Sequence, residues 1–360
     1  MMASRINVQQ FCEKYMVYLR GMMAVRLLVL VSTCLFWLSA CQSENGESMA
    51  TAADAIVVKD IRGSEVRLSE PAKRVIVLYQ GALDGMYMLN AEHTVVGIQN
   101  NIYTNPETFR YFSKLDPRIA RKELPTPGNW ETSTNIESVL ALKPDLVIIA
   151  SGQTDAIRLL ESLGIPVFAV SPQNNDQLFE EIEGIGKLTG THERAVELLA
   201  YTRRKLGEIA DATDQIDQKK SVYYAWSGGR IYSTSGQNSR MAECFRLAGV
   251  NNACTFEIDQ PNINPETLIS WDPDLILLWS TDPQVLYDKK ELAVLKAVRN
   301  KNVHVLDPPF FYDPHTLKIM YAAIELHNVS YGGNEHFDLE ENRRDIMTNL
   351  YGAKATALLE

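Results

Sequence analysis

The sequence has few of the residues and motifs that most often carry catalysis. Five cysteines and six histidines occur among its 360 residues, and none of them forms a CxxC or HExxH pair. A Walker loop and a Gly-x-Ser-x-Gly nucleophile elbow are also missing, since Ser151 and Ser280 end expected strands without that setting. We therefore expect no catalytic residues and no cofactor, and we predict that the protein is not an enzyme.

Clusters of basic residues are equally scarce. The formal net charge is −10, and the longest basic block, Arg203-Arg204-Lys205, is expected on the solvated face of a helix. These features argue against a nucleic-acid partner. The apolar fraction of 46% and the charged fraction of 22% are typical of a soluble globular protein, and the length suits two lobes of ordinary size.

Apolar segments long enough to cross a membrane comfortably are missing as well. Residues 27–40 form an apolar segment that is too short for this, and Arg26 precedes it. This layout is typical of a secretion signal, which we assign to residues 1–40.

The signal ends in Leu-Ser-Ala-Cys, which resembles the bacterial lipobox. In that motif a signal peptidase cuts before a cysteine that carries lipid, so Cys41 is expected to be the lipid anchor, with residues 41–54 as a polar tether. An ordinary cleaved signal or an uncleaved anchor is the alternative. Residues 1–21 would form a signal n-region of unusual length, so Met22 or Met23 is a candidate for the true translation start.

Cysteine pairing stays open. Cys12 and Cys34 precede the expected cleavage site, so only Cys244 and Cys254 remain besides the anchor. They form a disulfide in one interpretation and two buried free thiols in the other.

A repeat dominates what the sequence does contain. Residues 136–151 and 265–280 share a glutamate, a Pro-Asp-Leu motif, an aliphatic run and a final serine at one constant offset. Each copy is typical of a short helix followed by a buried strand. The repeat predicts two similar lobes.

The stretch between the two copies predicts their connection. Residues 176–188 have helical periodicity with Asn174 or Asn175 as N-cap, and after Gly190 a second helix begins that Thr191 is expected to cap. About twenty residues of helix span about 30 Å, the width of a small domain. We therefore assign the N-terminal lobe to residues 55–175, the bridging helix to 176–215 and the C-terminal lobe to 216–360.

Strands and helices alternate within each expected lobe. A hairpin at residues 56–68 is followed by strands at 74–78, 95–98, 146–150 and 166–170, and the second lobe has strands at 221–226, 275–279 and 303–306. Strand–helix–strand spacing implies right-handed crossovers and parallel sheets. The predicted fold class is α/β, with two Rossmann-like parallel-sheet lobes bridged by one long helix. Residues 100–130 are predicted to be an irregular, aromatic-rich insertion, and residues 292–298 and 316–329 to be helical.

Residues 56–352 resemble the solute-binding lipoproteins of ABC importers for iron chelates, haem and cobalamin. The resemblance rests on Pro71 with Lys73-Arg74-Val75, both Pro-Asp-Leu repeats, the glycines of 184–190 and the tail at 336–339. It implies the class III periplasmic-binding-protein fold, a ligand in the cleft between the lobes, and a lipid-anchored location in the periplasm or on the outer face of the cytoplasmic membrane. It also implies a permease dimer with its cytoplasmic ATPase as partner, docked by a glutamate on each lobe, which here matches Glu137 and Glu266.

The expected ligand site lies where the carboxyl ends of the strands of both lobes face the cleft. Aromatic rings suit a large, partly apolar chelate or macrocycle, and arginine suits its anionic groups. The candidates are Tyr79, Tyr103, Trp130, Gln153, Trp226, Arg230, Tyr232, Trp279, Tyr312 and His315.

His315 has two interpretations. It either completes the coordination of a chelated metal or hydrogen-bonds the backbone at the start of the following helix. The alternative functions are a receptor for molybdate, tungstate or a nickel complex in a smaller cleft, and a chelatase-like enzyme of the cell envelope.

Overall fold

The computed structural model describes residues 55–128, 134–226, 228–306, 313–332 and 337–360. Within it, Ala55–Glu360 form one compact unit. The expected signal, the lipid anchor at Cys41 and the tether lie outside the described residues, as do Trp130 and Tyr312.

The compact unit begins with the predicted hairpin. Strands β1 (Ile56–Lys59) and β2 (Glu65–Leu68) pair antiparallel. Gly63 adopts a φ of +78° in the turn, a conformation that glycine reaches without a steric penalty.

The first lobe contains a four-stranded parallel sheet with the order β4-β3-β5-β6. All four residues of β3 are buried, as expected for a parallel sheet covered on both faces. Its strands are β3 (Val75–Leu78), β4 (Val95–Ile98), β5 (Leu146–Ala150) and β6 (Val167–Val170).

The helices of the first lobe correct one prediction. The segment expected to be irregular contains α3 (Asn101–Thr104), α4 (Pro106–Leu115) and α5 (Pro117–Ala120). Asn105 and Asp116 each cap the helix that follows, and each is followed by a proline in the first turn. The other helices are α2 (Gln80–Met88), the short 3-10 helix η1 (Glu92–Thr94), α6 (Ile136–Ala141) and α7 (Thr154–Ser162).

The second lobe repeats this arrangement. Its parallel sheet has the order β10-β9-β7-β8. Read from β8 to β10, this order matches β4-β3-β5-β6 of the first sheet strand for strand. The strands are β7 (Ser221–Ala225), β8 (Asn251–Asn252), β9 (Leu275–Trp279) and β10 (Val303–Leu306). The helices are α10 (Arg240–Leu247), α11 (Pro265–Trp271), α12 (Gln284–Tyr287), the 3-10 helix η2 (Lys290–Val294) and α13 (Lys296–Arg299). The single helix predicted at 292–298 is therefore divided between η2 and α13.

The two copies of the sequence repeat occupy equivalent settings. Asp145 Oδ2 accepts hydrogen bonds from the backbone of Lys73 and Arg74 before β3, and Asp274 Oδ2 accepts one from Ser221 at the start of β7. Each aspartate follows the proline of its copy of the repeat and fixes the start of the neighbouring strand. The residues before the two prolines also match, because both have positive φ: Lys143 at +48° and Asp272 at +38°.

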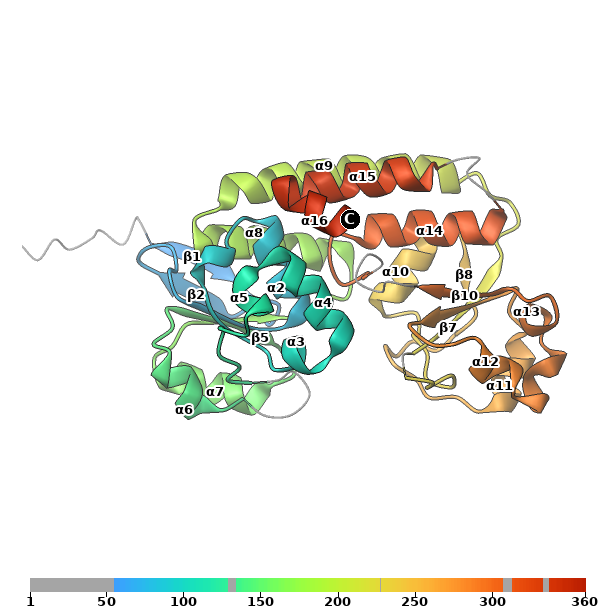
Figure 1. The fold of residues 1–360 in the computed structure, drawn as a ribbon, viewed down its shortest axis with the longest axis horizontal. Coiled ribbons are helices and arrows are strands. Elements are labelled where there is room, and N and C mark those ends of the chain that lie inside the picture. The colour runs from blue at the N-terminus through green and yellow to red at the C-terminus, as the bar shows by residue number, and fades with distance from the viewer. Residues whose placement is uncertain (1–54, 129–133, 227, 307–312, 333–336) are drawn as a thin grey trace, which may run out of the picture. The chain divides into compact units, whose positions relative to one another are not determined.

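Two long helices connect the lobes. Helix α8 (Asn175–Thr189) begins at Asn174, whose side chain accepts from the amide of Gln177, and ends at Gly190 in the left-handed conformation. Helix α9 (His192–Thr213) follows and passes over both lobes (Figure 1). Thr191 is its N-cap residue, but the threonine hydroxyl pairs with that of Thr189 and does not cap the helix.

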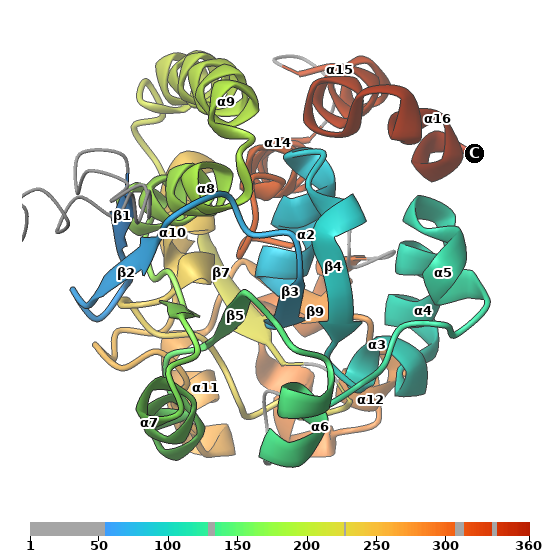
Figure 2. The ribbon, with the colours of Figure 1, turned by 90° about the vertical axis from the view of Figure 1, so that its left-hand side faces the viewer.

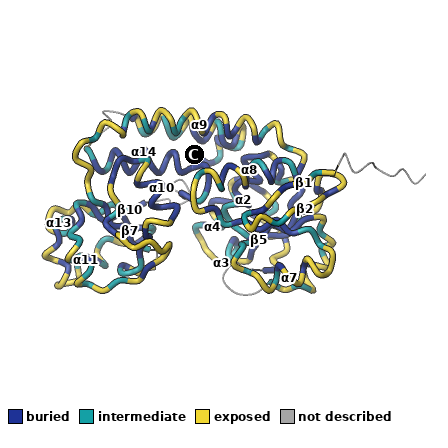
Figure 3. Tube along the Cα trace, turned by 180° about the vertical axis from the view of Figure 1, so that it is seen from behind, coloured by how far each residue is buried: buried dark blue, intermediate teal, exposed yellow. Residues whose placement is uncertain are grey.

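The C-terminal helices return to the first lobe. Helix α14 (Ile319–Tyr331) packs on α9 and α10, and most of its residues are buried (Figure 3). Helix α15 (Leu339–Tyr351) contacts α2, and α16 (Ala355–Leu359), which follows the 3-10 helix η4 (Gly352–Lys354), contacts α4 (Figure 2). The end of the sequence, assigned to the C-terminal lobe, thus packs in part on the N-terminal one.

No helix in the described ranges combines the length and the apolar character needed to cross a membrane.

Candidate binding cleft between the lobes

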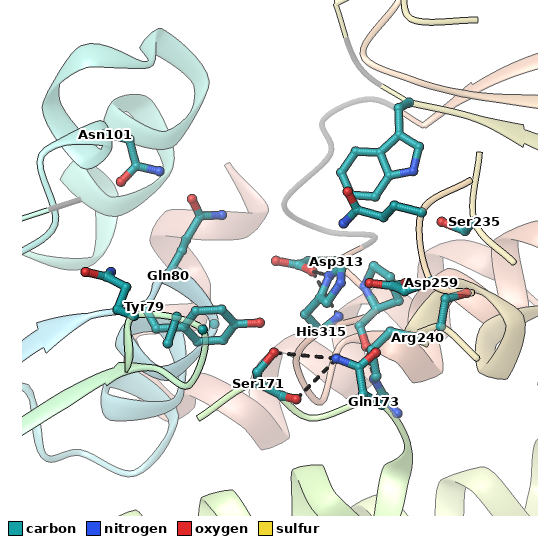
Figure 4. Close-up of a pocket in the computed structure, with 18 of the residues that line it drawn as sticks. Tyr79, Gln80, Asn101, Ser171, Gln173, Ser235, Arg240, Asp259, Asp313 and His315 are labelled. Atoms are coloured by element: carbon teal, nitrogen blue, oxygen red, sulfur yellow. Dashed lines mark hydrogen bonds and ion pairs between the residues drawn. The ribbon is translucent and has the colours of Figure 1, made fainter. Parts of the chain in front are cut away.

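A cleft of about 1070 Å³ opens between the two lobes. Residues at or just after the carboxyl ends of strands from both sheets line it, including Tyr79, Ala150 and Ser171 from the first lobe and Trp226 and Trp279 from the second. Figure 4 shows Tyr79 and Ser171 of the first lobe across from Ser235 and Asp259 of the second. This is the position that the topology of parallel sheets favours for a ligand.

Tyr79 and Trp226 are equivalent residues of the two lobes. Val75 pairs with Leu146 in the first sheet, and Val222 pairs with Leu275 in the second, where the two leucines occupy the same place in the repeat. Counting along β3 and β7 from these pairs aligns Trp226 with Tyr79. An aromatic ring from each lobe therefore faces the cleft.

The environment of these rings keeps them neutral and in place. Burial raises the pKa of Tyr79 far above its usual range, so its hydroxyl stays protonated. Trp226 Nε1 donates to the carbonyl of Thr234 at 3.0 Å, and the ring lies edge-on to Tyr224 at 6.1 Å between centroids. The faces of such rings suit a flat or apolar ligand.

The loop before α14 contributes an oriented histidine. The Nδ1 atom of His315 lies 3.0 Å from Asp313 Oδ1, which also accepts the backbone N–H of His315. Burial alone would raise the pKa of Asp313, but the hydrogen bond and charge of His315, together with the charge of Lys318, hold it below its usual value. The charged carboxylate is therefore the hydrogen-bond partner of Nδ1, which fixes the direction of the ring and leaves Nε2 to meet another partner.

Contacts between the lobes hold this loop and one side of the cleft. Lys318 is fully buried, and its Nζ lies 2.7 Å from Asp84 Oδ2 of the first lobe. On another side of the cleft, Ser280 Oγ of the second lobe donates to Glu107 Oε1 of the first.

A known protein family has this arrangement of two lobes and a cleft. The family described as periplasmic binding protein matches residues 75–310. The chain belongs to this family. Because its members bind solutes, the match confirms the prediction that this periplasmic binding protein is not an enzyme. It also agrees with a location in the cell envelope.

Three relatives illustrate the range of the family. An uncharacterized ABC transporter substrate-binding lipoprotein, YvrC of Bacillus subtilis, is 24% identical over 296 residues, which cover 80% of this chain and 90% of the relative. A cobalamin-binding protein of Halobacterium salinarum is 27% identical over 224 residues, which cover 61% of this chain and 57% of the relative. The iron(3+)-hydroxamate-binding protein FhuD of Bacillus subtilis is 25% identical over 300 residues, which cover 78% and 90%.

Solved structures show the same fold. Molybdate-bound MolA of Haemophilus influenzae superposes with a TM-score of 0.71 at 20% identity, covering 82% of this chain and 97% of MolA. CeuE of Helicobacter pylori, in a structure described as a Ni-His complex, gives a TM-score of 0.72 at 18% identity, covering 85% of this chain and 99% of CeuE. The predicted fold class is confirmed.

Five of the ten predicted ligand residues line the cleft of this periplasmic binding protein: Tyr79, Gln153, Trp226, Trp279 and His315. Two others, Trp130 and Tyr312, lie outside the described residues. Contact with a ligand stays a prediction for all of them.

The remaining three candidates do not line the cleft. The Tyr103 hydroxyl accepts the backbone N–H of Leu124, and the Tyr232 hydroxyl donates to Glu291 at 3.3 Å. The Arg230 guanidinium lies over the ring of Trp226, 5.6 Å from its centroid, and Arg230 is exposed. Each of these three side chains therefore has a partner within the protein.

Sequence reasoning missed several residues that line the cleft, among them Arg240, Asp259 and Glu107. A signal existed for Arg240, since it shares a helix face with Glu243 and Cys244, and all three are buried. Asp259 lies in an irregular segment without periodicity. Burial raises its pKa, while the nearby charge of His315 opposes that rise.

The remaining candidates concern docking and cysteine chemistry. Glu137 and Glu266 are exposed in the first turns of α6 and α11, which lie at the ends of the lobes remote from α9 (Figures 1 and 2). Cys244 and Cys254 are both buried and free, which favours the interpretation as thiols. Within the described part of the chain, no group of three or more His, Cys, Asp or Glu side chains could hold a metal ion.

Proposed function

We propose that this periplasmic binding protein captures a metal chelate and delivers it to an ABC permease with its ATPase. The chelate is an iron siderophore, haem or cobalamin. The observation that carries the proposal is the cleft of about 1070 Å³ with Tyr79, Trp226 and Trp279 among its lining residues. The names of the relatives that bind cobalamin and ferric hydroxamate support it.

Cleft size favours a large ligand over a bare oxyanion. Ligand pockets of about 300–1,000 Å³ bury most of a drug-sized molecule, and a siderophore or corrinoid needs a pocket at the upper end of that range. Molybdate, the ligand named for MolA, is far smaller. A molybdate receptor is therefore the second candidate, supported by the likeness to MolA in structure and in sequence.

His315 is the proposed protein ligand to the metal of the chelate. Histidines that ligate metals almost always donate their other ring N–H to a carboxylate or carbonyl, which fixes the tautomer and direction of the ring. Asp313 is such a partner here, at 3.0 Å from Nδ1. The chelator would fill most of the coordination shell, and His315 Nε2 would fill an open position.

Delivery requires an anchor and docking sites. We propose that lipid on Cys41 holds the protein at the membrane and that Glu137 and Glu266 dock on the permease. Both glutamates are exposed at equivalent positions of the two lobes, so they can meet a two-fold symmetric partner. Exposed charges of this kind mainly steer encounter and orientation.

Tryptophan fluorescence tests the proposal on the mature protein. A ferric trihydroxamate, haem, cobalamin and molybdate are titrated separately, and we expect one of the three chelates to quench the emission saturably. Trp226→Phe should remove part of the signal, whereas Trp271→Phe should not, because Trp271 packs against Tyr223 and Phe256 outside the cleft. Saturable binding of molybdate alone would favour the second candidate, and no response to any chelate would contradict the proposal.

A further inference from the structure

Arg240 is a buried cation whose charge has no ion-pair partner among the described residues. It begins α10, lines the cleft and is 1% exposed. Its Nε donates to the Pro314 carbonyl at 2.9 Å, and its Nη2 donates to Asn175 Oδ1 at 3.0 Å. Its Nη1 is buried without a hydrogen-bond partner in the described part of the chain. Both acceptors are neutral, so they leave the positive charge uncompensated.

Glu181 is the second unpartnered group near this position. It belongs to α8, is 6% exposed, and has a buried Oε2 without a hydrogen-bond partner among the described residues. Burial raises the pKa of Glu181 to about 8, while the charge of Arg240 opposes that rise. At neutral pH most of Glu181 is therefore protonated and does not neutralise Arg240.

The surrounding titratable groups do not supply the missing charge either. Tyr79 and Cys244 stay neutral near pH 8, because burial raises the pKa of both, that of Cys244 to about 12. Asp313 is ionised but paired with His315. Asp259 also lines the cleft, but no ion pair joins it to Arg240 among the described residues. Glu243 accepts a hydrogen bond from Asn175 at 2.9 Å and is paired with Arg246.

A buried charge and a buried orphan polar atom are costly unless a partner satisfies them. A guanidinium presents a planar fork of N–H donors that matches a carboxylate or similar oxyanion. We propose that Arg240 forms an anion subsite in the cleft, where it binds a carboxylate or another anionic oxygen group of the metal chelate, and that buried Glu181, which does not line the cleft, takes up a proton from solvent as that group binds. This inference rests on the proposed function and names the charge of its ligand.

The proton uptake follows from electrostatics. An anion beside Arg240 cancels the field that now favours ionised Glu181, so the pKa of Glu181 rises further in the complex. The complex then holds more protons than the free protein. Affinity for an anionic chelate is therefore full below about pH 8, the pKa of Glu181 in the free protein, and falls as the pH rises above it.

Matched ligand pairs test the subsite in the full mature protein. The pairs are haem and its dimethyl ester, a carboxylate-bearing ferric hydroxamate and its methyl ester, and cobalamin monocarboxylate and cobalamin. Since hydrogen bonds to charged groups contribute roughly 1.5–3 kcal/mol, the carboxylate member of the bound pair should bind about 10- to 100-fold tighter at pH 7. The preference should shrink at pH 9, and calorimetry in buffers of different ionisation enthalpy should detect proton uptake near pH 8.

Three variants separate the roles of the residues. Arg240→Gln should abolish the preference, and Arg230→Gln should keep it, because Arg230 lies outside the cleft. Glu181→Gln should keep the preference but remove its dependence on pH between 7 and 9. If Arg240→Gln does not fold, the affinities of the wild-type protein for the acid and the ester still test the anion subsite.

The outcomes distinguish this subsite from the proposed function. Equal affinity of acid and ester in the wild-type protein overturns the anion subsite while the chelate-binding function stands. A preference that Arg240→Gln leaves intact, or proton uptake that survives in Glu181→Gln, also overturns it. If no member of any pair binds, both proposals fail.

Discussion

Lys318 shows how one side chain fixes the geometry of the cleft. Its Nζ is 2.7 Å from Asp84 and 2.9 Å from the Tyr111 hydroxyl, and Tyr351 donates to Asp84 at 2.8 Å. Asp84 and Tyr111 come from the first lobe, whereas Lys318 follows the loop of His315. Burial raises the pKa of Asp84, and the charge and hydrogen bond of Lys318 oppose that rise. A buried pair of this kind is sensitive to the loss of either partner.

Lys318→Met should therefore lower the free energy of unfolding by about 3–5 kcal/mol, because Asp84 would keep a buried charge without its cation. Urea unfolding measures the effect. Lys354→Met is the matched control, since Lys354 pairs with Glu92 at 2.8 Å at a partly exposed position and should cost about 1 kcal/mol or less. Equal losses in the two variants would show that burial does not govern the Lys318 pair.

Glu181 should also make stability depend on pH. The pKa of Glu181 in the folded protein, about 8, lies above the ordinary value of 4.5, so the unfolded chain loses this proton first as the pH rises. Its contribution to stability is full below about pH 4.5 and is lost as the pH rises through 8. Glu181→Gln should flatten the decline in urea stability between pH 5 and 8.

Glu183→Gln is the control for that series. Glu183 lies on the same helix, and a hydrogen bond from Lys187 lowers its pKa, so its contribution is lost only as the pH falls. This variant should therefore leave the slope between pH 5 and 8 unchanged. A decline that is the same in wild type and Glu181→Gln would exclude Glu181 as its source.

At the scale of the element, the repeated helices α6 and α11 show what an N-cap residue contributes to stability. Asn135 caps α6 by accepting from Ser138, and Asn264 caps α11 by accepting from Thr267. Both helices are short, so one capping bond is a large part of their local stability.

Asn135→Ala and Asn264→Ala should each lower the free energy of unfolding by about 1 kcal/mol, because each leaves an orphan N–H at an equivalent helix start. Thermal or urea unfolding checks the pair. Thr191→Ala serves for comparison, since its side chain does not cap α9. Clearly unequal losses at Asn135 and Asn264 would contradict the equivalence of the two settings.

The same capping chemistry explains which elements could be predicted. The repeat and the aliphatic strands were assigned correctly because buried parallel strands are continuous apolar runs bounded by turns. Helices α3 to α5 were missed although Asn105-Pro106 and Asp116-Pro117 are N-cap and first-turn signals. The aromatic residues of this segment favour a binding loop when they are considered alone, but Tyr111 and Phe112 pack inside the lobe.

The site could be predicted only where chain topology decides it. Tyr79, Trp226 and Trp279 follow strands whose carboxyl ends must face the cleft. Tyr232 and Arg230 are close to such an end in sequence, but they do not line the cleft, because the sequence pattern does not set side-chain direction in an irregular segment. The spacing of Arg240, Glu243 and Cys244 marks one helix face, but only the packing of α10 against its neighbours shows that Arg240 reaches the cleft.

At the scale of the whole molecule, the matched lobes bear on delivery. Glu137→Ala combined with Glu266→Ala should abolish chelate uptake in cells carrying the permease, while fluorescence titration of the purified variant stays as in wild type. The physical reason is that both lobes must present a charge to a two-fold partner.

The control for docking replaces two other exposed first-turn glutamates, Glu193 and Glu340, by alanine. Uptake should survive in that variant, because it removes the same charge from helices that lie elsewhere on the molecule. Full uptake in the Glu137/Glu266 variant would rule out the docking proposal.

The return of α15 and α16 to the first lobe has a consequence for biosynthesis. The hydroxyl of Tyr351 bonds to Asp84 and Tyr111, so residues 240 and 267 positions apart complete one polar cluster. The first lobe therefore cannot complete its packing before the chain as far as Tyr351 has been made and is free to fold. We expect the first lobe to close together with α15 and α16, and not ahead of them.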